Sequence, residues 1–207
     1  MHYVGNALMA FSFFILLFIY YPIIVIYLFP PRLPSNIHEL SFAIEIPKIH
    51  VYAPIIPNVD PFNENQYRDV LHHGIALTKG TSIPGDSYLF AHSSDYPWDI
   101  TRYNTIFFRL SELNNGDEIL IAKAKEVFRY KVFDKKVIWP NDTHYLTNSI
   151  NNNIDSSNLK NNKSNSPQVL PSSNEGEPRH NRGELILQTC WPLGTSLQRL
   201  LIFARVV

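Results

Sequence analysis

Residues 184–207 read ELILQTCWPLGTSLQRLLIFARVV and contain two apolar runs separated by a short connection. Each run is rich in branched aliphatic residues and has the length of a buried strand. The connection, which starts at Trp191, holds a proline and a glycine, and both residues favour a turn. This stretch therefore predicts two core strands joined by a turn, with Cys190 at the end of the first strand and Arg199 at the start of the second.

Shorter runs of the same kind lie upstream. Apolar or alternating segments bounded by turn residues occur at 41–56, 87–91, 118–122 and 126–133, and short helices are expected at 65–74 and 105–113. Prolines break the first of these segments, which suits an edge strand or a bent strand pair. The pattern predicts a mainly β domain with short helices, folded as a closed or nearly closed barrel.

A polar tract interrupts the domain between residues 141 and 182. It consists mainly of Asn, Ser and other short polar residues, including the triplet 151–153. Such a composition buries too little apolar surface to offset the entropy of ordering a chain. The sequence therefore predicts a long flexible loop here.

The N-terminal segment 4–29 contains no charged residue and is long enough to cross a hydrocarbon core about 30 Å thick. It runs into a proline-rich spacer at 30–40 and lacks the small-residue exit of a cleaved signal peptide. We therefore expect an uncleaved transmembrane anchor followed by a domain spanning 41–207. Flanking charges are too few to orient the anchor.

Composition excludes several classes of function. The formal net charge is +0 and the pI is about 7.1, so there is no basic footprint of the kind that binds nucleic acid. Cys190 is the only cysteine, which rules out an internal disulfide and a cysteine-based zinc site. A lone thiol is most often a small buried hydrophobe, so a role for Cys190 needs further support.

That support comes from two other polar residues at strand ends. His92 follows the apolar run 87–91, and Arg199 opens the last strand. Strand ends of a barrel meet at a common rim, where distant residues can converge. An imidazole can take the proton of a thiol, and a guanidinium suits the negative charge that develops on a carbonyl oxygen during acyl transfer.

Three separated blocks also resemble one family. Residues 44–49 (IEIPKI), residues 90–94 (FAHSS) and residues 187–195 (LQTCWPLGT) with Arg199 are similar, in this order along the chain, to the sortases. The connection after Cys190 is closest to class D/E-like or housekeeping-type sortases. The resemblance implies a closed sortase-like barrel of about eight strands.

The resemblance also implies an activity. A sortase is a cysteine transpeptidase that cleaves an LPXTG-like sorting signal and transfers the acyl group to an amine from a peptidoglycan precursor or a pilin. Cys190 would be the nucleophile, His92 the acid and base, and Arg199 the cation beside the oxyanion. Residues expected to contact substrate are Thr189, Trp191, Ala91 and Ser93. No metal or organic cofactor is implied, and the expected place is the cell membrane, single-pass, with an extracytoplasmic catalytic domain.

Alternatives remain at this point. The chain could be a catalytically inactive sortase-fold binding module, while the cysteine setting of an L,D-transpeptidase is absent. Arg205 shares the strand face of Arg199, and the family spacing favours Arg199. The pair 72–73 (His-His) is expected to be a solvated helix end. Residues 60–62 (DPF) are similar to the lid motif of pilin-building sortases, but they follow the first strand, so we expect a turn.

Overall fold

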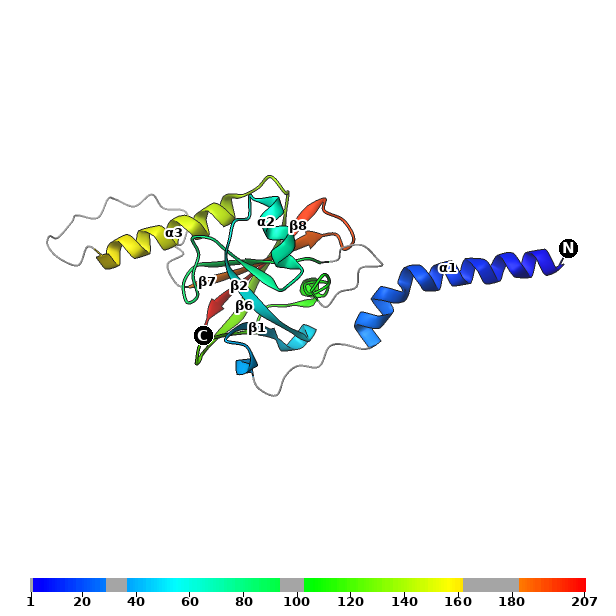
Figure 1. Cartoon of the computed structure of the whole chain (residues 1–207), viewed down its shortest axis with the longest axis horizontal. Helices are drawn as coiled ribbons and strands as arrows, with labels where there is room; N and C mark the ends of the chain where they lie inside the picture. The colour runs from blue at the N-terminus through cyan, green and yellow to red at the C-terminus, as the bar shows by residue number, and fades with distance from the viewer. Residues whose placement is uncertain (1, 29–36, 94–102, 162–182) are drawn as a thin grey trace.

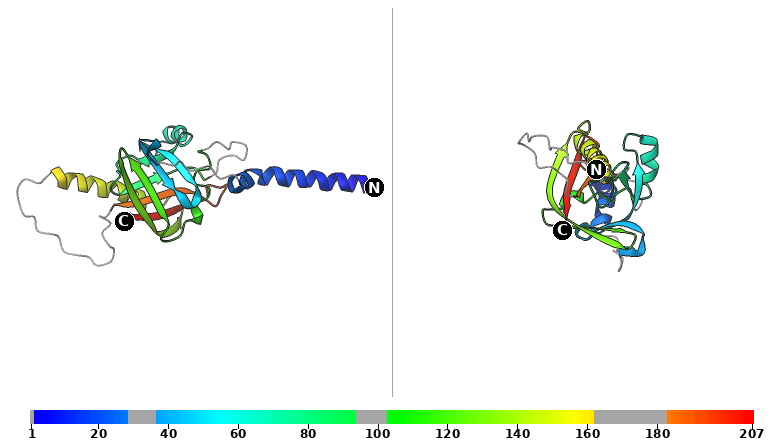
Figure 2. Two further views of the ribbon diagram at one scale, coloured as in Figure 1. Left: turned by 90° about the horizontal axis from the view of Figure 1, so that it is seen from below. Right: turned by 90° about the vertical axis from the view of Figure 1, so that its left-hand side faces the viewer.

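The computed structural model describes residues 2–28, 37–93, 103–161 and 183–207, and it consists of a β-barrel with a long N-terminal helix beside it (Figure 1). The strands are β1 Phe42–Ile46, β2 Val51–Val59, β3 Ile75–Thr78, β4 Ser87–Phe90, β5 Glu118–Lys123, β6 Glu126–Ile138, β7 Glu184–Trp191 and β8 Gln198–Val206. They form one closed barrel in the order β1-β2-β3-β4-β7-β8-β6-β5, which Figure 2 shows from two further sides. The prediction of a closed barrel of about eight strands is confirmed.

The sheet is mixed. β2 pairs in parallel with β3, and β4 pairs in parallel with β7, whereas the other neighbours are antiparallel. Alternate residues of each strand fill the interior: from β7 the inner residues include Leu185 and Leu187, which are completely buried. The intervening side chains of the same strand face outward, because successive residues of a strand point to opposite sides.

Two helices cover parts of the outer face. α2, Glu64–Leu71, follows β2 and is capped by Asn63, whose side-chain oxygen accepts a hydrogen bond from the Gln66 amide at 3.3 Å. α3, His144–Asn161, follows β6 and packs where β4, β7 and β8 present apolar side chains outward. Single-turn helices are η1 Ile37–Glu39, η2 Pro47–Ile49 and η3 Leu110–Glu112.

α3 corrects the prediction of a flexible loop for 141–182. Residues 144–161 are helical because Leu146 and Ile150, one turn apart, pack on the outer barrel face, and Asn152 donates to the Asp86 carboxylate at 2.7 Å. The polar composition of this tract therefore did not predict the helix, because the helix is stabilised by packing on the barrel. The remainder of the tract, 162–182, and most of the 30–40 spacer lie outside the described residues.

The helix expected at 105–113 is also corrected. The segment consists of turns that end in η3, and its apolar residues Phe107, Leu110 and Leu113 are completely buried. Packing of these side chains into the barrel core, rather than helical periodicity, fixes the backbone.

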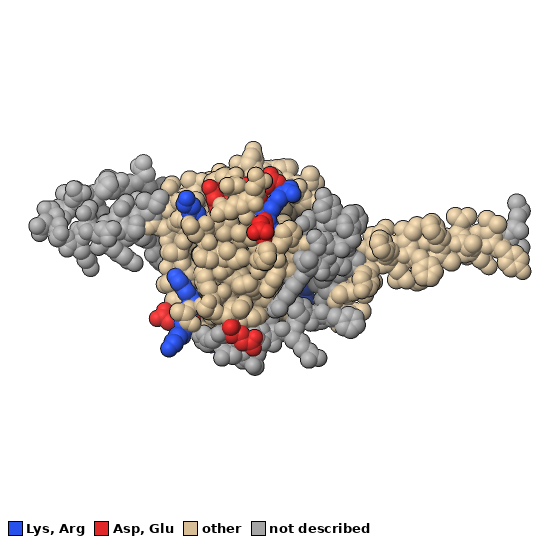
Figure 3. Space-filling view, viewed as in Figure 1, with Lys and Arg blue, Asp and Glu red and all other residues tan. Residues whose placement is uncertain are grey.

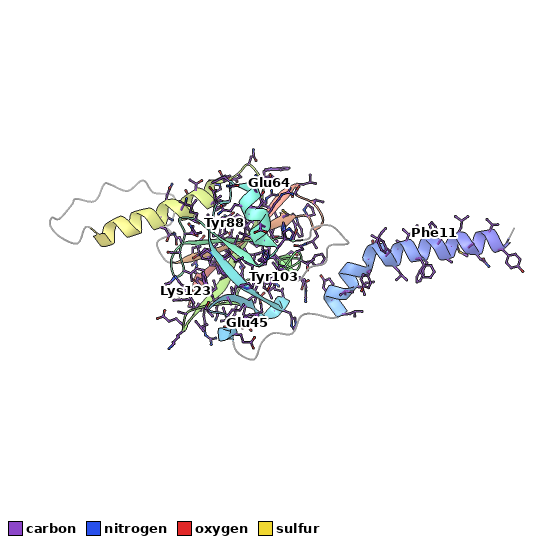
Figure 4. All side chains as sticks on the ribbon, viewed as in Figure 1. Phe11, Glu45, Glu64, Tyr88, Tyr103 and Lys123 are labelled. Atoms are coloured by element: carbon purple, nitrogen blue, oxygen red, sulfur yellow. The ribbon has the colours of Figure 1, made fainter. Side chains whose placement is uncertain are left out.

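α1, His2–Leu28, extends away from the barrel (Figure 1) and carries no Lys, Arg, Asp or Glu (Figure 3). Its side chains project freely, as Phe11 shows in Figure 4, and the stretch Tyr3–Tyr21 is long and apolar enough to cross a membrane. Its last turn contacts the barrel: the Tyr27 hydroxyl donates to Glu112 Oε1 at 2.7 Å, and the Arg109 guanidinium lies 5.0 Å from the Tyr27 ring centroid. The part of α1 nearest the domain is thus attached to η3.

Candidate active site

Cys190 and Arg199 are direct cross-strand partners in the β7–β8 pair. Side chains of directly opposed residues lie on the same face, with Cβ atoms about 4.5–5.5 Å apart. Their neighbours Thr189 and Leu200 are buried on the inner side, so the thiol and the guanidinium lie on the outer face. Both residues are half-buried. Strand register therefore places the sulfur next to a cation.

His92 reaches the same place through the parallel pairing of β4 and β7. Phe90 is in register with Gln188, and the Ala91 amide donates to the Gln188 carbonyl at 3.2 Å. Two residues beyond this last pair come His92 and Cys190, and both line the same groove. The Phe107 amide donates to the His92 carbonyl at 3.1 Å and fixes the backbone beyond the strand.

The three residues line one groove with a volume of about 570 Å³, within the range of small-ligand sites. β4 and β7 form its floor, α2 and the turn before it form one wall, and the β6–α3 connection forms the other. Besides Cys190, His92 and Arg199, the groove is lined by Pro61, Phe62, Glu64, Tyr67, Arg68, Leu71, His72, Tyr88, Phe90, Ala91, Pro140, Asp142, Thr143, Leu146, Gln188, Thr189 and Ser196.

The backbone of the β7–β8 connection holds the Arg199 guanidinium. Arg199 Nη1 donates to the Ser196 carbonyl at 2.9 Å and to the Gln198 carbonyl at 3.0 Å. Within the described part of the chain no carboxylate forms an ion pair with Arg199, and its hydrogen bonds all come from Nη1. The guanidinium is therefore positioned by neutral groups, and its remaining N–H donors can serve a substrate oxygen.

His72 was not expected in the site. It follows the last residue of α2 and lines the groove, with its ring centroid 6.1 Å from that of His92. Its Nδ1 lies 3.1 Å from Oδ1 of the completely buried Asn104. The expectation of a solvated helix end is incomplete, because His72 is exposed toward the groove. Among the described residues no group of three or more His, Cys, Asp or Glu side chains could hold a metal.

The four residues expected to contact substrate are placed differently from one another. Thr189 and Ala91 line the groove, but their side chains are buried, and the Thr189 hydroxyl donates to the Ala91 carbonyl at 3.1 Å. Trp191 packs against the barrel core and does not line the groove. Ser93 is 1% exposed, and its Oγ has no hydrogen-bond partner among the described residues. Strand parity explains why the Thr189 and Trp191 side chains do not point outward with Cys190, since both lie on the inner side of β7.

The sequence did not predict most of the residues that form the two walls of the groove. Residues 60–62 form the expected turn, with the Phe62 amide donating to Asp60 Oδ1 at 2.9 Å, yet Phe62 is also 69% exposed at the groove. Tyr67, on the same wall, packs edge-on against Phe90 of the groove floor, and burial raises the pKa of Tyr67. A signal was available in the aromatic residues of 60–67, but only the fold shows which way they face.

The chain is thus an eight-stranded mixed barrel that holds a thiol, an imidazole and a guanidinium in one groove on its outer face. A family model described as the sortase domain matches residues 44–207, and the chain belongs to the sortase family.

Individual relatives are similar at lower identity. Sortase D of Bacillus subtilis (strain 168) is 23% identical over 172 residues, which cover 82% of this chain and 65% of that protein. Solved structures with the same fold include sortase A from Corynebacterium diphtheriae (23% identity, TM-score 0.54, covering 81% of this chain and 60% of that one). Another is sortase C-1 from Actinomyces oris (26% identity, TM-score 0.53, covering 80% and 72%). The chain thus spans less than two thirds of the length of the first two. The similarity to sortase D fits the class D-like interpretation of the sequence.

Proposed function

We propose that the chain is a membrane-anchored cysteine transpeptidase that cleaves an LPXTG-like sorting signal and transfers the acyl group to an amine. The observation that carries this proposal is the convergence of three groups in one groove: Cys190 is the cross-strand partner of Arg199 on β8, and His92, two residues past the end of β4, lines the same groove. The groove that contains them is open to an extended peptide, because its floor is the outer face of two strands.

In the first half of the reaction, the Cys190 thiolate attacks the carbonyl carbon of the Thr–Gly bond. The oxygen of that carbonyl becomes negatively charged, and the Arg199 N–H groups that are not bonded to the β7–β8 backbone stabilise it. As the C–N bond breaks, His92 donates its proton to the leaving glycine amine. The products of this half are a thioester on Cys190 and a peptide with a free amino terminus.

In the second half, an acceptor amine attacks the thioester carbonyl. His92, now neutral, removes the proton of the attacking nitrogen, and the thiolate leaves as the new amide bond forms. The acceptor would be an amine of a peptidoglycan precursor or of a pilin. Every step uses groups of the chain and its two substrates, so the chemistry itself requires no metal or organic cofactor.

α1 supplies the membrane part of the proposal. With the stretch Tyr3–Tyr21 in the bilayer, we place the barrel on the extracytoplasmic side because sorting signals and cell-wall amines are presented there. The family model supports the assignment of the domain, and the apolar helix supports the single-pass anchor.

The test uses the full-length chain in detergent, incubated with a panel of LPXTG-like peptides and an amine acceptor. Mass spectrometry should detect an acyl-enzyme and a transpeptidation product, and both should disappear in Cys190→Ala. His92→Ala and Arg199→Ala should lower kcat/KM by about 10²–10⁴-fold, the range for loss of an acid–base group or an oxyanion donor. Arg205→Ala, which changes the other outward arginine of β8, is the matched control and should retain activity. A folded wild-type chain that forms no adduct with any peptide would instead support an inactive binding module.

A further inference from the structure

The groove floor contains one polar pair close to the nucleophile. Gln188 lies on β7 two residues before Cys190, on the same outer face, and lines the groove. Residues two apart on a strand are separated by about 7 Å. An extended peptide advances by the same distance in two residues, so a substrate lying along β7 over Cys190 also passes over Gln188.

Tyr88 orients the Gln188 side chain. Its hydroxyl donates to Gln188 Oε1 at 2.6 Å, and its ring is 2% exposed among apolar residues that include Leu146 and Ile186. Figure 4 labels Tyr88 on the side of the barrel where α3 begins. Burial raises the Tyr88 pKa, so the hydroxyl keeps its proton and remains a donor across the working pH range.

This donor fixes which end of the amide is available. If the amide were reversed, Nε2 would donate to the tyrosine oxygen, and the buried hydroxyl proton would have no bonded acceptor among the described residues. Oε1 is therefore engaged with Tyr88. No hydrogen bond joins Nε2 to any described residue, and Gln188 is only half-buried. The groove floor thus presents two N–H donors on a residue whose backbone lies about 7 Å along the strand from that of Cys190.

We propose that Gln188 is a substrate-binding residue whose Nε2 donates to a main-chain carbonyl of the peptide about two residues from the scissile bond. The inference deepens the proposed function and rests on it. Every residue, including proline, has a main-chain carbonyl, so this contact does not depend on the side chain at that position. It instead favours a peptide that lies extended along β7. The neighbouring Phe90 and Leu146 are left to contact the side chains.

Two variants of the full-length chain in detergent test the contact. Gln188→Glu keeps an acceptor for the Tyr88 hydroxyl but removes both N–H donors. The double variant Tyr88→Phe/Gln188→Leu removes both polar groups without adding charge or stranding a buried hydroxyl. For each we expect kcat/KM with the best LPXTG-like peptide to fall about 5- to 30-fold, mainly through KM, as for the loss of one hydrogen bond. Gln66→Glu, on α2 and outside the groove lining, is the matched charge control and should match the wild type.

The rate of Cys190 alkylation by iodoacetamide separates substrate binding from an effect on the nucleophile. In the double variant it should stay within about twofold of the wild type, because the small reagent does not reach over Gln188. A double variant with unchanged kcat/KM would overturn the inference. So would a double variant that loses alkylation and peptide turnover together, since the effect would then act through Cys190. Failure of the wild type itself to form a Cys190-dependent product would overturn the proposed function and, with it, this inference.

Discussion

Replacing Thr189 by Val tests how the two segments that carry Cys190 and His92 are held together. The Thr189 hydroxyl is buried and donates to the carbonyl of Ala91, the residue before His92, at 3.1 Å. This bond joins the residue before Cys190 on β7 to the residue that follows β4 and precedes His92. Val has nearly the same shape, so the substitution removes the bond without opening a cavity.

The loss of stability follows from the Ala91 carbonyl, which is left without its hydrogen-bond donor. A buried carbonyl that loses its donor costs about 1–3 kcal/mol, partly offset because the hydroxyl no longer has to be desolvated. We expect a loss of about 1–2 kcal/mol in the free energy of unfolding, which corresponds to a fall in Tm of roughly 2–8 °C for a chain of this size. Because small misplacements of reacting groups are expensive, kcat should fall about tenfold while KM changes little.

Thermal unfolding followed by circular dichroism and peptide kinetics on the same full-length samples measure both effects. Thr147→Val is the matched control: its hydroxyl makes the same kind of bond, at 3.0 Å to the Thr143 carbonyl, but on the exposed side of α3. That control should change stability by less than about 0.5 kcal/mol. Thr189→Ser should restore most of the wild-type behaviour. If Thr189→Val unfolds and turns over like the wild type, the reasoning about this bond is wrong.

Three further predictions concern the scaffold. Asp86→Ala should lower the free energy of unfolding by about 2–4 kcal/mol in urea titrations, because both carboxylate oxygens accept hydrogen bonds that join the turn before β4 to α3 and β7. A change below about 1 kcal/mol would contradict this. Gly74→Ala should cost about 1–3 kcal/mol or more, since an added Cβ would lie 2.5 Å from the Pro54 carbonyl oxygen; a neutral result in the same titration would show that the backbone yields freely. A hydrogen bond from Arg109 lowers the pKa of Glu112 from its ordinary value of 4.5, so this carboxylate stabilises the fold above that value and the contribution is lost as pH falls through the lowered one. Glu112→Gln should therefore reduce the loss of stability on acidification, by less than about 1 kcal/mol because the pair is partly exposed, and an unchanged pH profile of urea midpoints would refute the link.

The sequence predicted those parts of the fold that are set by local alternation. The runs ending at Cys190 and before His92 are strands whose inner faces are mainly apolar, with Leu89, Leu185 and Leu187 in the core, and the ends of both runs line one groove. α3 could not be predicted, because few of its described side chains are apolar and they acquire a partner only when β4, β7 and β8 are assembled.

The same limit applies to the groove walls. Cys190, His92 and Arg199 were recognisable by spacing, whereas Gln188 and Phe62 acquire a role from register and from the position of the turn before α2. A residue's identity shows what chemistry it can perform. The pairing of strands shows whether it faces the groove or the barrel interior.

The attachment of Tyr27 to Glu112 bears on how the protein would meet its substrates. From the end of the candidate span at Tyr21 to Leu28, α1 rises only about 10 Å, and Tyr27 is already in contact with the barrel. With α1 inserted, the domain would remain next to the lipid headgroups and diffuse in two dimensions. A sorting signal anchored in the same bilayer would then encounter the groove at the high local concentration of a tethered pair. Weak affinity for the signal would suffice, and the length of chain between membrane and motif would help to decide which proteins are processed.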